Sequence, residues 1–171
     1  MKVNCLTKNN GIPPKYQEGL FTAISVGFGL LLVGTLFIIT PNLLSKIVDF
    51  FKDFNLVDVP NTNIIFPAPG HPSIHSVLYQ AAAQFSIALT VFQVVILALR
   101  FIIPSSLVKK SESVSNLVYW AGASFLIQSF LIDTARVSLT NWFEFWSLII
   151  VLAGISILAR AAFMTVSRIQ Q

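Results

Sequence analysis

The chain has 171 residues, of which 55% are hydrophobic and only 11% are charged. A soluble domain usually carries roughly 25% charged residues to cover the surface that it leaves in water. This composition excludes a soluble globular protein, a disordered chain and a nucleic-acid-binding domain, although the net charge is +4.

Long segments without charge predict transmembrane helices. No charged residue lies between Glu18 and Lys46, and the 22 residues of 19–40 would span about 33 Å as a helix. A bilayer core is roughly 30 Å thick. We therefore expect an all-α membrane protein with four transmembrane helices in a bundle, forming a single membrane domain over residues 1–171. The predicted spans are 19–40, 76–101, 114–132 and 143–165.

Small residues recur where helices could approach each other closely. Gly19, Ala23 and Gly27 repeat every four residues in the first span, and Gly122 lies in a small-residue patch of the third. Such patterns are typical of helix packing in membranes. They fit either packing within the chain or contacts in a homo-oligomer.

The first span is followed by a predicted amphipathic helix over 41–55, with Thr40 as its N-cap and Pro41 in its first turn. Its apolar residues fall within an arc of about 160°. This pattern predicts an external helix that lies in the headgroup region of the lipid bilayer, or a lid across the ends of the spans. The apolar residues are Leu43, Leu44, Ile47, Val48, Phe50, Phe51 and Phe54.

A proline-rich segment, 56–75, comes next and is predicted to be an extended external strap. Its four prolines exclude a regular helix. Its apolar run Ile64, Ile65 and Phe66 is expected to pack against the bundle.

The strap ends in the chain's two histidines, His71 and His75. Their four-residue spacing can present two metal ligands, and Asp58, Asp133 or Glu144 could supply a third. Interfacial, solvated histidines are the simpler interpretation. No cofactor is predicted.

The second and third spans carry neutral polar residues but no ionisable residue near the midplane. This absence argues against ion-coupled transport. The polar side chains fit hydrogen bonds between helices, or a narrow polar path for a neutral solute. The residues of this path are Gln80, Gln84, Thr90, Gln93, Asn116 and Gln128.

The fourth span is bounded by Glu144 and Arg160, which lie about 24 Å apart along a helix. Glu144 stands three residues after Asn141, as in a capping box. Arg160 is expected to extend to the interface. A functional charge pair is the alternative.

The distribution of lysine and arginine predicts the orientation. Eight lie on the side of the termini and three on the other side. Both termini are therefore expected in the cytoplasm, with the chain in the cell membrane. The eight are Lys2, Lys8, Lys15, Arg100, Lys109, Lys110, Arg160 and Arg168; the three are Lys46, Lys52 and Arg136.

The order of an amphipathic helix, the segment PNTNIIFPAP and a closing WFEFWSLIIVLAGISILARA resembles that of small, uncharacterised four-span integral membrane proteins of archaea. The resemblance covers most of the chain and implies the same architecture. It implies no activity, cofactor or catalytic residue.

The sequence contains no motif for catalysis, so we expect no enzyme. Small-residue packing surfaces and apolar external segments favour a non-catalytic structural or accessory subunit of a membrane assembly, with copies of itself or other subunits as partners. The alternatives are a small channel or carrier for a neutral solute and a metal-binding protein that uses the histidine pair.

Overall fold

The computed structural model describes residues 14–103, 105–132 and 137–169. Expectations that concern Lys2, Cys5, Lys8, Asp133 and Arg136 lie outside the described residues.

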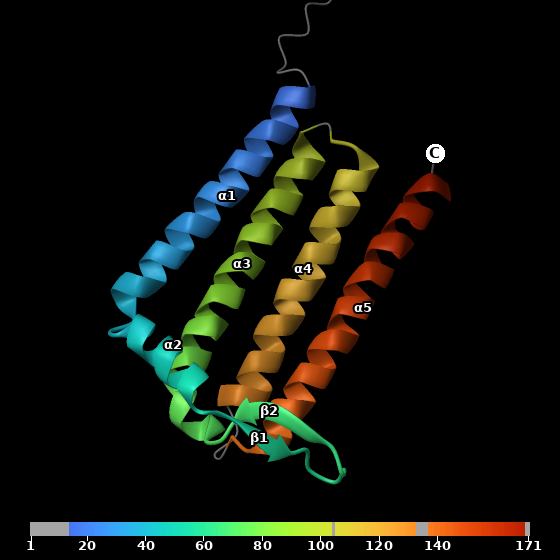
Figure 1. Cartoon of the computed structure of the whole chain (residues 1–171). Helices are drawn as coiled ribbons and strands as arrows, with labels where there is room; N and C mark the ends of the chain where they lie inside the picture. The colour runs from blue at the N-terminus through green and yellow to red at the C-terminus, as the bar shows by residue number, and fades with distance from the viewer. Residues whose placement is uncertain (1–13, 104, 133–136, 170–171) are drawn as a thin grey trace, which may run out of the picture.

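Four long helices lie side by side in the order α1, α3, α4, α5 (Figure 1). Each forms most or all of a helical segment long and apolar enough to cross a membrane, which confirms that part of the prediction. These segments are Glu18–Ile39, Pro72–Ile102, Leu107–Ile132 and Leu139–Ser167. The helices themselves are α1 (Pro14–Ile39), α3 (Ser76–Ile102), α4 (Leu107–Ile127) and α5 (Leu139–Ile169).

Helix α4 begins seven residues before the predicted span at 114. Ser106 caps it by accepting a hydrogen bond from the Lys109 N–H. The first turns of α4 therefore contain Lys109, Lys110 and Glu112. Charged residues limit the apolar segment of a helix, but the helix itself can continue beyond that segment. A π-helical turn over Gln128–Ile132 continues α4 at its other end.

Each long helix packs against its neighbour in the row: α1 against α3, α3 against α4, and α4 against α5. The α4–α5 contact is close, because a Cβ placed on Gly122 would lie 2.8 Å from Leu152 Cδ2. Helix α1 packs on α3, where the Phe28 and Phe92 rings stack with centroids 4.1 Å apart. Among the described residues, α1 and α5 share no comparable contact, so the predicted bundle is not confirmed.

A short helix, α2 (Leu43–Lys52), follows α1. The expected cap at Thr40 is wrong, because the Thr40 N–H still bonds to Leu36 O at the end of α1. The N-cap is Asn42, whose φ of 56° makes the turn between the helices. Asparagine adopts this left-handed conformation more readily than most residues.

The apolar face of α2 is divided. Leu43 is buried with Leu36 of α1 and Ala81 of α3, whereas Leu44 and Phe51 are 65% and 67% exposed. Part of the face thus covers the helix ends as a lid does. Its contact with lipid stays a prediction.

The predicted strap contains an antiparallel hairpin, β1 (Phe54–Asp58) and β2 (Ile65–Pro69). The prolines exclude a helix here, as expected, but they do not prevent β1 from pairing with β2. Each strand has only one partner, so a proline without an N–H is tolerated on its open edge. A 3₁₀ turn over Pro72–His75 then leads into α3.

Of the three residues expected to pack against the bundle, Phe66 does so, with its ring edge to face on Phe143 of α5. All three are nevertheless more than half exposed. The hairpin instead buries Ala68 and Pro69, at the end of β2. Ala68 packs in the core with Tyr79 and Trp142, whereas the tip of the hairpin extends away from the helix ends (Figure 1).

The main core lies at the end of the row that carries α2 and the hairpin, which we call the hairpin end. The opposite end, where α1 begins and α5 ends, we call the termini end (Figure 1). Buried core residues at or near the hairpin end are Ala68, Tyr79, Ala83, Leu126, Ile127, Leu131, Trp142 and Phe145.

Candidate functional site

Both predicted histidines contact Asp53, which directly follows α2. The His71 Nδ1 lies 3.0 Å from Asp53 Oδ1, and the His75 Nε2 lies 3.1 Å from Asp53 Oδ2. The His71 backbone N–H also donates to Oδ2 at 2.8 Å. We call these three residues the Asp53 clasp.

The fold brings the clasp together by returning the chain through the hairpin. Asp53 and His71 flank the two paired strands, so their 18-residue separation closes at the open end of the hairpin. The Asp53 carbonyl accepts the Gly70 N–H at 2.9 Å. A Cβ at Gly70 would lie 3.2 Å from the Asn55 Nδ2, so a side chain there would press on this turn.

Hydrogen bonding keeps Asp53 ionised. The bond from the His71 side chain, supported by the His71 N–H and by His75, lowers the pKa of Asp53 from 3.8 to about 2, against the opposing effect of burial. An ionised carboxylate only accepts hydrogen bonds. His71 therefore donates from Nδ1 and His75 from Nε2.

The two histidines differ in burial, which corrects the expectation that both are solvated. The His71 side chain is 74% exposed, but that of His75 is 6% exposed. The Phe50 ring of α2 lies edge to face on His75, with centroids 5.1 Å apart. Phe50 also contacts Tyr79 and Trp142, so His75 is at the margin of an aromatic cluster.

The carboxylate that joins the histidines is not one of the three proposed from the sequence. Among the described residues, Asp58 and Glu144 form no ion pair with them, and Asp133 is outside the described residues. The described residues contain no group of three His, Cys, Asp or Glu side chains placed to hold a metal ion. What the geometry supports is a structural link from α2 and the hairpin to the start of α3.

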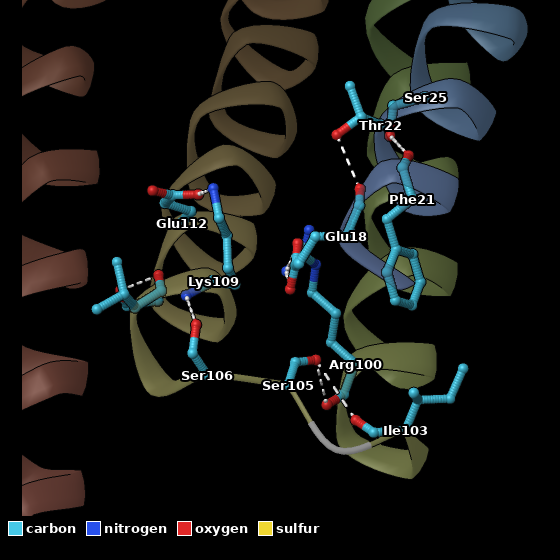
Figure 2. A network of polar contacts seen from close by, with 12 residues as sticks. Glu18, Phe21, Thr22, Ser25, Arg100, Ile103, Ser105, Ser106, Lys109 and Glu112 are labelled. Carbon is cyan, nitrogen blue, oxygen red and sulfur yellow. Dashed lines mark hydrogen bonds and ion pairs between the residues drawn. The ribbon is translucent and has the colours of Figure 1, made fainter. Parts of the chain in front are cut away.

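A second polar network lies at the termini end (Figure 2). Arg100 Nη1 of α3 lies 3.4 Å from both carboxylate oxygens of Glu18 on α1. The guanidinium also lies 5.0 Å from the Phe21 ring. The Arg100 side chain is 11% exposed, so α1 supplies both its counter-charge and its aromatic cover.

The same end links α4 to α5 through Glu112. Its Oε2 lies 2.9 Å from Lys109 Nζ, and its Oε1 lies 3.3 Å from Arg160 Nη2. Arg160 is 40% exposed and pairs with Glu112, so the alternative of a charge pair between Glu144 and Arg160 is wrong. The capping box of α5 is also one turn earlier than expected, between Ser138 and Asn141.

The predicted polar path is distributed over several surfaces. Gln80 and Gln84 line a pocket of about 250 Å³ with Thr40 at the hairpin end. Thr90 donates to the Ser86 carbonyl of its own helix, and Gln93, Asn116 and Gln128 are not among the residues of that pocket. A side-chain hydrogen bond between spans comes instead from Ser115, which donates to Ser156 O at 2.8 Å.

The small residues of α4 are packed against a neighbouring helix, whereas those of α1 are not. Gly122 lies against Leu152 between α4 and α5, as described above. A Cβ at Gly19 or Gly27 would meet nothing within 4 Å, and Ala23 is exposed. Packing within the described chain therefore does not account for the small residues of α1.

The sequence and the structure of the chain were compared with known proteins. The chain matches no protein family, no curated protein and no solved structure. The resemblance to four-span archaeal membrane proteins therefore stays a prediction.

Proposed function

We propose that this chain is a non-catalytic subunit of a membrane assembly, with a transmembrane helix of another subunit packed on α1. The partner helix belongs to a second copy of the chain or to a different protein. The observation that carries the proposal is the open small-residue face of α1.

Four small residues share this face within an arc of about 80°, counted at 100° per residue: Gly19, Ala23, Gly27 and Gly34. Built Cβ atoms on its glycines meet nothing within 4 Å. Small residues let helix backbones approach closely, which strengthens packing and weak hydrogen bonds between transmembrane helices.

The opposite face of α1 is already occupied. Phe21 is buried beside Arg100, and Phe28 stacks on Phe92 of α3. The glycine face therefore points away from the rest of the chain and is available to a partner within the bilayer.

Native mass spectrometry of the protein released in a mild detergent tests this proposal. We expect a particle heavier than one 18.9 kDa chain. A strictly monomeric particle with no copurifying protein would contradict it.

A second candidate, a path for a neutral solute, is favoured by the pocket that Gln80 and Gln84 line with Thr40. Gln84→Leu should slow solute flux into liposomes that contain the protein, and Gln128→Leu should slow it further if the path crosses the membrane. Unchanged flux in both variants would remove these residues from the path.

A further inference from the structure

Two pockets adjoin at the hairpin end and share Phe143 as a wall. The larger, of about 510 Å³, lies between the hairpin turn at 59–61, Phe130 and the first turns of α5. The smaller, of about 280 Å³, is lined by Phe54, Phe66, Pro67, Trp142, Phe143 and Trp146. Pockets of a few hundred Å³ are of the size that binds small molecules.

Aromatic rings form nearly all of the smaller pocket, and its walls are steeply inclined to one another. Phe66 and Phe143 meet at 80°, Phe54 and Trp142 at 84°, and Trp142 and Trp146 at 73°. The side chains that line it offer no hydrogen-bond acceptor. An aromatic pocket of this kind attracts a cation through the electron-rich faces of its rings. It suits a cation that has no N–H group in need of a hydrogen-bond acceptor.

The larger pocket supplies the charge. Glu144 is the one ionisable side chain among the described residues that line the two pockets, and no described cation pairs with it. Ser147 lines the same wall, with its hydroxyl donated to the Phe143 carbonyl, so its oxygen keeps acceptor capacity. The double pocket is thus negative and aromatic, which disfavours an anion.

We propose that this double pocket binds a quaternary ammonium group. The methyl groups contact the aromatic walls around Phe143, and the Glu144 carboxylate provides the counter-charge. A primary ammonium fits the smaller pocket less well, because its three N–H donors would meet no acceptor side chain there. The group can come from a soluble cation such as choline or from a choline lipid headgroup.

Tryptophan fluorescence of the full chain in an uncharged detergent provides the test, because Trp142 and Trp146 line the smaller pocket. The titrants are choline, ethanolamine and 3,3-dimethylbutan-1-ol, which is the neutral analogue of choline, all at constant ionic strength. We expect a saturable response to choline at a concentration roughly fivefold lower than for either of the others. An equal response to the neutral alcohol, or no saturable response to choline, would overturn the proposal.

Two variants locate the charge. Glu144→Gln removes it from an exposed position and should weaken choline binding roughly fivefold. Asp58→Asn, a matched exposed carboxylate of β1 that lines neither pocket, should leave binding unchanged. Equal affinities of Glu144→Gln and the unaltered protein would overturn the proposal.

Vesicles distinguish the two sources of the ligand. Equal choline affinity in phosphatidylethanolamine and phosphatidylcholine vesicles, neither of which carries a net charge, would identify a soluble cation. Weaker affinity in phosphatidylcholine alone would identify the choline headgroup, which then competes for the pocket. Absence of choline binding in phosphatidylethanolamine vesicles, where no choline headgroup competes, would contradict both.

Discussion

At the scale of single residues, Asp53 joins three parts of the hairpin end. It directly follows α2, its carboxylate binds His71 and His75, and its carbonyl accepts the Gly70 N–H at the end of the hairpin. The side chain is 14% exposed, so these bonds replace most of its contact with water. A half-buried carboxylate that accepts several hydrogen bonds stabilises the fold more when it is ionised than when it is protonated.

The first prediction concerns this ionisation. Because the folded pKa of Asp53 is lowered from 3.8 to about 2, its contribution is present above pH 3.8 and is lost as the pH falls towards about 2. Asp53→Asn should lower the free energy of unfolding at pH 7 by about 1 kcal/mol, because water partly screens this carboxylate, and it should remove this part of the acid sensitivity. Unfolding in detergent, followed by circular dichroism between pH 7 and 2, measures both.

Asp49→Asn is the matched control, because Asp49 is exposed one turn earlier on α2. It should leave the stability and its pH dependence unchanged. Equal acid sensitivity of Asp53→Asn and the unaltered protein would show that the clasp does not stabilise the fold.

At the scale of elements, the long helices are attached to one another in different ways. Helices α4 and α5 meet through Gly122, the Ser115 hydrogen bond and the Glu112–Arg160 pair. Helix α1 meets α3 through stacked rings and one ion pair near the termini end. We therefore expect substitutions between α4 and α5 to affect the whole fold, and substitutions at Glu18 to affect α1.

The second prediction concerns the α4–α5 contact. Gly122→Val should lower the free energy of unfolding by about 1–3 kcal/mol, because the new side chain meets Leu152. Leu152→Ala in the same chain should restore part of the loss by making room. Gly154→Val provides the control, since a Cβ at Gly154 meets nothing within 4 Å; an equal loss in both valine variants would mean that helix propensity, not packing, is responsible.

The third prediction concerns the attachment of α1. Glu18→Gln leaves the largely buried Arg100 without its carboxylate. We expect amide hydrogen exchange in the first turns of α1 to accelerate roughly tenfold, while exchange in α5 stays unchanged. Glu144→Gln on α5 is the control; protection of α1 that is the same in all three proteins would contradict this role of the ion pair.

The elements differ in how far the sequence predicts them. The apolar spans were predictable, because a helix must bury about 30 Å of apolar length in a bilayer and the charges mark its limits. The hairpin was not, since 56–75 shows no alternation and its prolines conceal the pairing of β1 with β2. Asp53 is hard to single out for the same reason: it lies inside the predicted helix 41–55, and only the hairpin returns His71 to it.

At the scale of the whole molecule, the row of helices places the start of α1 and the end of α5 at one end and the hairpin and α2 at the other (Figure 1). The row also leaves α1 with one packed face and one open face. The excess of lysine and arginine at the termini end predicts that this end faces the cytoplasm.

The fourth prediction tests this orientation. Cys5 is the only cysteine, so a membrane-impermeant maleimide should label the protein only after cells are broken open. A Cys5→Ser variant with cysteine at Asn61, in the hairpin turn, should show the reverse and react in intact cells. Labelling of Cys5 in intact cells would reverse the proposed topology.

The central claim is that the open face of α1 packs against another subunit, and native mass spectrometry of two glycine variants tests it most directly. Gly27→Leu places a large side chain on that face, whereas Gly154→Leu places it at an equally open position on α5. We expect Gly27→Leu to reduce the particle to one 18.9 kDa chain and Gly154→Leu to keep the mass of the unaltered assembly. An assembly that survives Gly27→Leu, or an unaltered protein that is already a single chain, would contradict it.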